Sequence, residues 1–275
     1  MQYVDYNNLQ VFVRTVFNPE LEQFSDERSK IVRKVLVQLL MYLEYTYSNA
    51  KYIYLDHSSA EIALRVVEER VIPQLYTSGC FSAKEMYQWC ENHLIPRLSE
   101  YFESVDKRLR LYRGQGFIAS KDLYLRIRDK LQIYETTLVF YYLLHPEIIQ
   151  YTASAADNFK YLYRYFILST DADMFYHDVR IRNHFTIIAS LLTDPSISIE
   201  DAINFTANER DASLQLAFAL RHEPRVVKKL FDHMCHSVRI WMASTLVIQP
   251  SRIAPSNSEF AAYLKKIRNA EVLTL

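Results

Sequence analysis

The chain has 275 residues, half of them hydrophobic, and its 32 basic side chains (Lys+Arg) are balanced by 32 acidic ones (Asp+Glu). This composition supports a substantial buried core and excludes a disordered chain. Zero net charge gives no support to wholesale binding of nucleic acid or of an anionic membrane, and three glycines leave almost nothing for tight turns or phosphate loops. Helices joined by short polar loops are therefore expected.

Three cysteines, Cys80, Cys90 and Cys235, are scattered along the chain. An odd, dispersed set fits a reducing compartment and argues against a disulfide framework. The stretch 1–17 lacks the basic region of a signal peptide, and the most apolar block, 138–144, is far shorter than the ~20 residues that span a bilayer. We expect a soluble, cytoplasmic protein without a membrane span or a cofactor, with delivery by a non-classical route left open.

Helical periodicity dominates the first half of the chain. The stretch 25–48 carries apolar residues at every third or fourth position, which predicts an amphipathic helix. The stretch 58–76 opens with Ser58 and Glu61, the spacing of a capping box, so a second helix is predicted there. Pro73 is expected to kink or end this helix because proline lacks the backbone donor.

The same pattern continues toward the middle of the chain. Ser82 and Glu85 repeat the capping spacing and predict the start of a third helix. Two more helices are predicted over about 96–113 and over 121–145, the latter being the longest. The segment 51–55 is the single strand candidate, and it is short.

The second half of the sequence contains an internal repeat. From about residue 155 the predicted helices become shorter and are punctuated by Asp, Asn and Pro. In the stretches 213–224 and 237–250, residues 213–219 align with 237–243 at an offset of 24, and each copy ends at a proline, the two prolines differing by two positions in register. A less regular copy runs over 184–205. The aligned pairs are Ser213/Ser237, Leu214/Val238, Leu216/Ile240, Phe218/Met242 and Ala219/Ala243.

The unit "VVKKLFDHMCHSVRIWMA" (226–243) resembles the leucine-rich-repeat variant, a helical repeat akin to HEAT repeats. The positions that match that pattern are Leu230, Val238, Arg239, Ala243 and Pro250. The resemblance covers about 180–255 and implies a surface of stacked helices that holds a partner protein. The family supplies no catalytic residues.

Together these observations predict an all-α protein with two domains. A helical domain is expected over 1–150, followed over 151–275 by a helical-repeat domain that resembles a short α-solenoid. The tail 270–275 is expected either to fray or to dock on a partner.

Two groups of residues raise the possibility of metal binding. His233, Cys235 and His236 follow Asp232 and could supply ligands, although the repeat assigns them to a turn between helices. The second group could bind a divalent cation, but acids that stabilise helix N-termini would explain it equally. Its members are Asp171, Asp173, His177, Asp178 and His184.

Cys90 and His93 lie three residues apart on one predicted helix and could form a nucleophilic pair. Catalytic pairs usually come from distant segments, so Cys90 is better explained as a packing residue between Trp89 and Leu94.

The best surface candidate is the segment 107–130, which has eight basic residues and two acidic ones, Asp122 and Asp129. With tyrosine and phenylalanine interleaved, it could contact an anionic partner or simply form a solvated face. The residues predicted to contact a partner are Arg110, Tyr112, Arg113, Arg126 and Arg239.

No sequence motif identifies a reaction. The leading hypothesis is therefore a non-enzymatic adaptor or an accessory subunit of a larger assembly, and the expected partner is another protein. The 21 tyrosines favour this reading, because tyrosine suits partly wet interfaces. The alternative is a nucleic-acid-associated protein that uses 107–130. A third hypothesis is a metal-dependent hydrolase built from the two metal-ligand groups.

Overall fold

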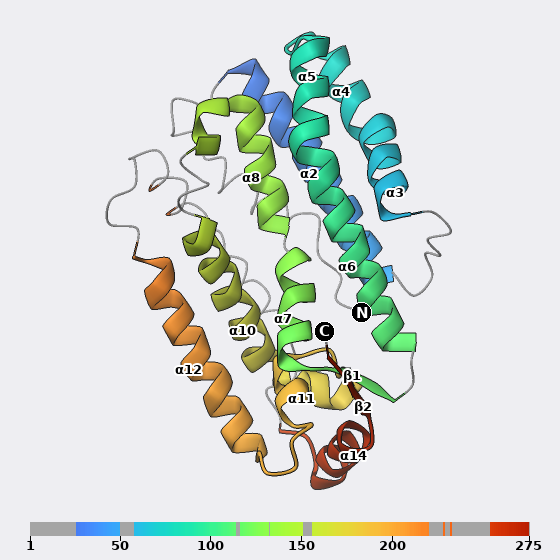
Figure 1. Cartoon of the computed structure of the whole chain (residues 1–275), viewed down its shortest axis with the longest axis vertical. Coiled ribbons are helices and arrows are strands. Elements are labelled where there is room, and N and C mark those ends of the chain that lie inside the picture. The colour runs from blue at the N-terminus through green and yellow to red at the C-terminus, as the bar shows by residue number, and fades with distance from the viewer. Residues whose placement is uncertain are drawn as a thin grey trace. The chain divides into compact units, whose positions relative to one another are not determined.

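The computed structural model of the chain is mostly helical, in agreement with the predicted all-α class (Figure 1). The residues that it describes are 26–49, 58–113, 116–131, 133–150, 156–219, 228, 232 and 254–274. They fall into two compact units, each described here by itself. Unit 1 contains the described parts of Met1–Asp106, Leu131–Ala156 and His222–Trp241; unit 2 contains those of Lys107–Lys130, Asp157–Arg221 and Met242–Leu275.

Both units take segments from either side of residue 150. The predicted division into domains 1–150 and 151–275 stays a prediction.

The regular elements among the described residues of unit 1 are all helices. Its elements are α2 (Glu27–Asn49), α3 (Ser59–Val66), η2 (Val67–Val71), α4 (Ile72–Thr77), α5 (Ala83–Trp89), η3 (Cys90–Leu94), the first part of α6 (Ile95–Arg113), α8 (Ile133–Leu144) and η4 (Pro146–Ile148). The predicted helices over 25–48, 58–76 and 96–113 are confirmed. The strand candidate 51–55 lies outside the described residues.

The core of unit 1 forms around α2, which packs against η2, α4 and α8. Its buried face carries the periodic apolar residues that predicted the helix: Val32, Val35, Leu36, Leu39, Leu40 and Leu43. Two long-range hydrogen bonds tie the surrounding helices together. The Tyr101 hydroxyl of α6 donates to the Leu43 carbonyl at 2.7 Å, and the Trp89 indole of α5 donates to the Val139 carbonyl of α8 at 2.7 Å.

Two consecutive helices of unit 1 share an unusual design. Each starts at a serine whose side chain accepts a backbone N–H, Ser58 before α3 and Ser82 before α5. Each then passes through a π-helical turn, η2 or η3, and reaches an Ile-Pro pair at Pro73 or Pro96. A proline ring clashes with the carbonyl four residues earlier in an α-helix. The wider turn accommodates the ring, and the helix continues.

Unit 2 contains helices and a small sheet. Its elements are the end of α6, β1 (Phe117–Ala119), α7 (Lys121–Lys130), α10 (Ala156–Ile181), α11 (Ile187–Leu191), α12 (Ile199–Ala217), α14 (Asn257–Arg268) and β2 (Glu271–Leu273). Helices α10 and α12 run antiparallel in Figure 1, and the Asn158 side chain donates to the Leu216 carbonyl at 3.1 Å.

Three expectations about these segments are wrong. The helix predicted over 121–145 is two helices, α7 and α8, with Leu131 in a turn between them. The helices after residue 155 are not uniformly short, because α10 has 26 residues and α12 has 19. Two of their interior polar residues, Asp171 and Thr206, are buried and form hydrogen bonds within unit 2.

The third wrong expectation concerns the tail 270–275. Residues Glu271–Leu273 pair in parallel with β1, with Ile118 opposite Val272. The Ser120 amide also donates to the Leu273 carbonyl at 2.8 Å. The tail therefore docks on its own chain, as a strand that periodicity over three residues could not predict.

The internal repeat is only partly described. Residues Ser213–Ala217 of the copy 213–224 form the end of α12, which begins at Ile199. The copy 237–250 lies outside the described residues. The solenoid arrangement stays a prediction.

Candidate functional site

Of the five predicted partner-contact residues, Arg126 is exposed on α7. Arg110, Tyr112 and Arg113 belong to the last turns of α6, and their side chains lie outside the described part of the structure. Arg239 lies outside it as well.

Several basic residues of the segment 107–130 contact groups within unit 2. The Arg108 guanidinium lies 5.7 Å from the Phe185 ring centroid, and the Lys121 ammonium lies 4.3 Å from that of Phe205. Burial raises the pKa of Asp171 and of Asp178, and the positive charge of Arg128 opposes this rise in both. Much of this positive charge therefore interacts with groups inside unit 2.

The pair Cys90 and His93 is not arranged for nucleophilic catalysis. Cys90 is buried, and this burial raises the pKa of its thiol to about 12, so the thiol stays protonated at neutral pH. The His93 ring packs edge-on against Tyr142, with 5.5 Å between the ring centroids. The interpretation of Cys90 as a packing residue fits this environment.

The first metal-ligand group, His233, Cys235 and His236, lies outside the described residues; of Asp232 only its helical backbone and exposure are described. The second group is dispersed. Among the residues that the structure covers, no three His, Cys, Asp or Glu side chains are placed to hold a metal ion.

Asp171 explains why that second group contains acids. It lies in the body of α10, so it does not stabilise the start of its own helix as expected. Its carboxylate accepts a hydrogen bond from the Tyr124 hydroxyl at 2.6 Å and from the Ile187 amide, the first residue of α11, at 2.7 Å. Asp171 therefore stabilises the N-terminus of a neighbouring helix and links α7, α10 and α11. Burial raises the pKa of Asp171 despite these bonds.

Asp178, two turns further along α10, is also buried. Burial raises the pKa of Asp178 to about 8, although the Asn183 side chain donates to its carboxylate at 2.9 Å. The Tyr263 hydroxyl of α14 in turn donates to the Asn183 carbonyl at 3.0 Å. This chain of polar contacts holds α14 against the turn that follows α10.

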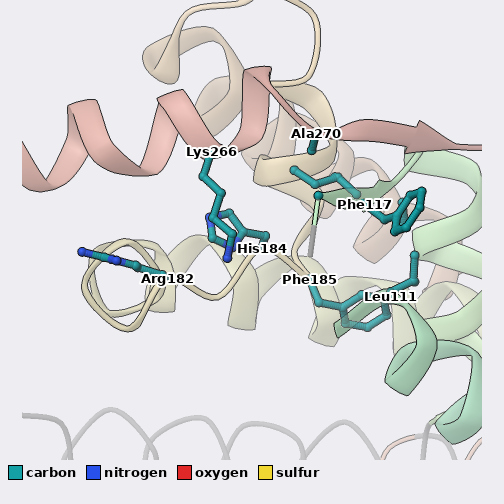
Figure 2. A pocket seen from close by; sticks show the side chains of 10 residues that line it. Leu111, Phe117, Arg182, His184, Phe185, Lys266 and Ala270 are labelled. Atoms are coloured by element: carbon teal, nitrogen blue, oxygen red, sulfur yellow. The ribbon is translucent and has the colours of Figure 1, made fainter. Parts of the chain in front are cut away.

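A cavity of about 80 Å³ opens beside this polar network, and all of its lining lies in unit 2 (Figure 2). Three basic residues line it, together with the apolar side chains Phe117 and Phe185. The rest of the lining is Leu111, Gly116, Ile118, Ala119 and Ala270. The basic residues are Arg182, His184 and Lys266, and none of the ten described lining residues is acidic.

Figure 2 shows the Lys266 side chain extending toward His184, whereas the Arg182 side chain points away from both. The His184 ring stacks on Tyr263 with 4.8 Å between centroids and 16° between planes. Burial lowers the pKa of His184 to about 4, and the charges of Lys266 and Arg182 act in the same direction. A neutral imidazole beside a lysine ammonium can contact an anion without a competing carboxylate.

The sequence points to some residues of this cavity only separately and gives no signal for the others. His184 was considered only as a metal ligand, and the segment 107–130 only as an outer surface. Lys266, Tyr263 and Asn183 were not singled out, because nothing local distinguishes a lysine that faces a cavity from one that faces solvent. The pairing of β1 with β2 is what brings residues 116–119 to Ala270.

No protein-family model and no curated protein sequence matches this chain. Within the described residues, no helix is both long and apolar enough to cross a membrane. The fold and the cavity thus define a mostly helical protein with a small cationic site.

Proposed function

We propose that the chain is a non-enzymatic adaptor or accessory subunit that binds another protein. The observation that carries this proposal is a set of large apolar side chains exposed on consecutive helices of unit 1. Leu64 of α3 is 43% exposed, Tyr76 of α4 is 64% exposed and Tyr87 of α5 is 52% exposed. Helices α4 and α5 contact each other. Tyrosine in this setting is typical of protein interfaces, since it offers a large rigid surface with a polar tip.

Three buried titratable groups of the chain support the same reading. Buried Asp171 and Asp178 accept hydrogen bonds from neighbouring residues, and the Cys90 thiol stays protonated. Catalytic groups need an accessible substrate and a pKa matched to their task. These three groups are better explained by their structural roles.

Two finer features belong to the proposal. A helical-repeat surface over 151–275, on the resemblance to leucine-rich-repeat variants, would give the partner a second contact area. A cytoplasmic setting accords with Cys80 and Cys90, which are free thiols in the described part of the chain. The nucleic-acid alternative gains nothing from Arg108 and Lys121, which contact aromatic rings.

Site-specific photo-cross-linking tests the proposal. A photoreactive amino acid at position 87 should give a discrete cross-linked protein in source cells, while the same group at exposed Lys84 on the same helix should not. Mass spectrometry identifies the product, including a second copy of this chain.

The partner then allows a direct affinity measurement. Tyr76→Ser should weaken its binding at least tenfold, as loss of an interface tyrosine does. Arg65→Ser, at an exposed charge on α3, is the matched control and should leave affinity within twofold. Equal cross-linking at positions 84 and 87, or equal affinity for Tyr76→Ser and the parent chain, would refute the proposed surface.

A further inference from the structure

We infer that the cavity of unit 2 is a binding site for a phosphate group, held by Lys266 and His184 with Arg182 at its rim. The site belongs to unit 2, whereas the exposed residues of α3 to α5 belong to unit 1, and it does not depend on the proposed protein partner. Its ligand chemistry is an oxyanion, supplied either as free inorganic phosphate or as the end of a small phosphomonoester.

The size of the cavity limits the ligand. A water molecule needs about 10–15 Å³ by this measure, so about 80 Å³ holds a handful of waters. That room suits a single phosphate group. It is far below the roughly 300–1,000 Å³ of pockets that enclose drug-sized ligands, so a whole nucleotide does not fit.

The charge of the cavity selects an anion. Lys266 of α14 extends toward His184 in the turn after α10, and Arg182 of the same turn lies at the edge of the cavity with its side chain directed away (Figure 2). The described lining of the cavity provides no carboxylate to neutralise them. A bound anion stabilises positive charge gathered in this way.

His184 gives a second reason to expect a bound anion in this cavity. Its Nε2 atom is buried and has no hydrogen-bond partner among the described residues, and the stack on Tyr263 fixes the ring plane. A buried polar atom without a partner costs free energy that a ligand recovers. An anion bound beside the ring also favours the imidazolium form, which can donate from Nε2.

The backbone of Arg182 has an unusual conformation. Helix α10 ends at Ile181, and Arg182 follows it with a φ of 56°, the left-handed conformation in which glycine is the usual residue. The Asn183 amide donates back to the Asp178 carbonyl at 2.8 Å, which closes this helix end. An arginine in a conformation that costs it free energy is typical of a functional position.

The apolar side chains that line the cavity distinguish the two sources of phosphate, the free ion and a phosphomonoester. Phe117 and Phe185 line the cavity, and Phe117 is partly exposed. A phosphomonoester with an aromatic group would contact these side chains, while inorganic phosphate would not.

Isothermal titration calorimetry on the full chain tests the site with inorganic phosphate, phenyl phosphate and benzoate at matched ionic strength. Phosphate should bind, and Lys266→Met should weaken it at least tenfold. The control Lys265→Met, an exposed lysine of α14 outside the lining, should change it less than twofold. Lys266→Arg keeps the charge and should retain binding. Tighter binding of phenyl phosphate assigns the ester source, and equal binding assigns free phosphate.

Two further measurements separate binding from folding. Arg182→Gly should weaken phosphate binding several-fold while its urea unfolding midpoint stays equal or rises, because glycine suits the left-handed backbone. The NMR titration of His184 should move upward from about 4 when phosphate is added. No binding of either phosphate, equal losses in Lys266→Met and Lys265→Met, or benzoate binding as tightly as phosphate would overturn the inference.

Discussion

Asp178 behaves as a buried acid that prefers to keep its proton. Burial raises its pKa to about 8, the neighbouring charge of Asp171 acts in the same direction, and the bond from Asn183 opposes both. In the unfolded chain an aspartate titrates near 3.9. The folded state therefore binds more protons than the unfolded state between about pH 4 and pH 8, and the stability contributed by this group falls as the pH rises through that window.

Asp178→Asn should remove this dependence, because the amide keeps the shape and cannot ionise. The free energy of unfolding of the parent chain should decline relative to the variant by up to ~1.4 kcal/mol per pH unit between pH 4 and pH 8. Urea titrations at several pH values measure the difference. Asp173→Asn, at an exposed acid of the same helix, is the control and should run parallel to the parent chain. Parallel curves for Asp178→Asn would contradict the assignment.

The two described cysteines should differ sharply in reactivity. The Cys90 thiol is buried with its pKa raised to about 12, whereas Cys80 is half-buried. Since alkylation requires the thiolate and access, iodoacetamide at neutral pH should modify Cys80 at least tenfold faster. Mass spectrometry of a chain carrying Cys235→Ser follows both sites. Comparable rates would show that the α5–α6 helix opens readily.

Among the elements, the two π-helical turns of unit 1 have a common cause. The Ile72 amide donates to the Val67 carbonyl and the Ile95 amide to the Cys90 carbonyl, so each bond spans five residues directly before a proline. The extra residue moves the clashing carbonyl away from the proline ring. Val67 and Val71, the first and last residues of η2, are both buried, as are Cys90 and Leu94 at the ends of η3.

Removing one residue from such a turn should be tolerated only without the proline. Deletion of Glu69 in a Pro73→Ala background should convert η2 to an ordinary α-helical turn and keep the fold. The same deletion with Pro73 present should cost about 3 kcal/mol or more, the penalty of proline inside an α-helix. Far-UV circular dichroism and urea unfolding compare the two. Equal stability of the two deletions would disprove this explanation of the π turn.

Local patterns were the predictable part of the fold. Ser58 and Glu61 form the expected capping box because both partners lie within one turn. The partners of Asp171 lie 47 and 16 residues away, so sequence reasoning attributed that carboxylate to its own helix. The cavity was equally hidden, since its lining comes from α6, β1, the turn before α11, and α14. Tertiary contacts, which no local period encodes, create it.

For the whole molecule, the balance of charge sets its solution behaviour. The net charge is zero and the sequence isoelectric point is about 7.1. Proteins associate most readily where their net charge vanishes, because little repulsion separates the copies.

Solubility should therefore pass through a minimum near pH 7. Replacing exposed Gln88 and Asn92 by Glu and Asp should move the minimum to lower pH, and replacing both by Lys should move it to higher pH. Precipitation by polyethylene glycol across pH 5 to 9 measures the position. If the pH of minimum solubility is the same in both variants as in the parent chain, apolar contacts control association.

The pairing of β1 with β2 has a consequence for synthesis on the ribosome. The two strands are separated by about 150 residues of chain, and unit 2 cannot close its small sheet until the second strand emerges. At roughly 5–20 residues per second that delay is on the order of 10–30 s. Ala270 and Lys266 arrive with the same late segment. Until that segment emerges, residues 117–119 of the nascent chain lack their strand partner, and the cationic cavity forms only after the rest of unit 2 has been made.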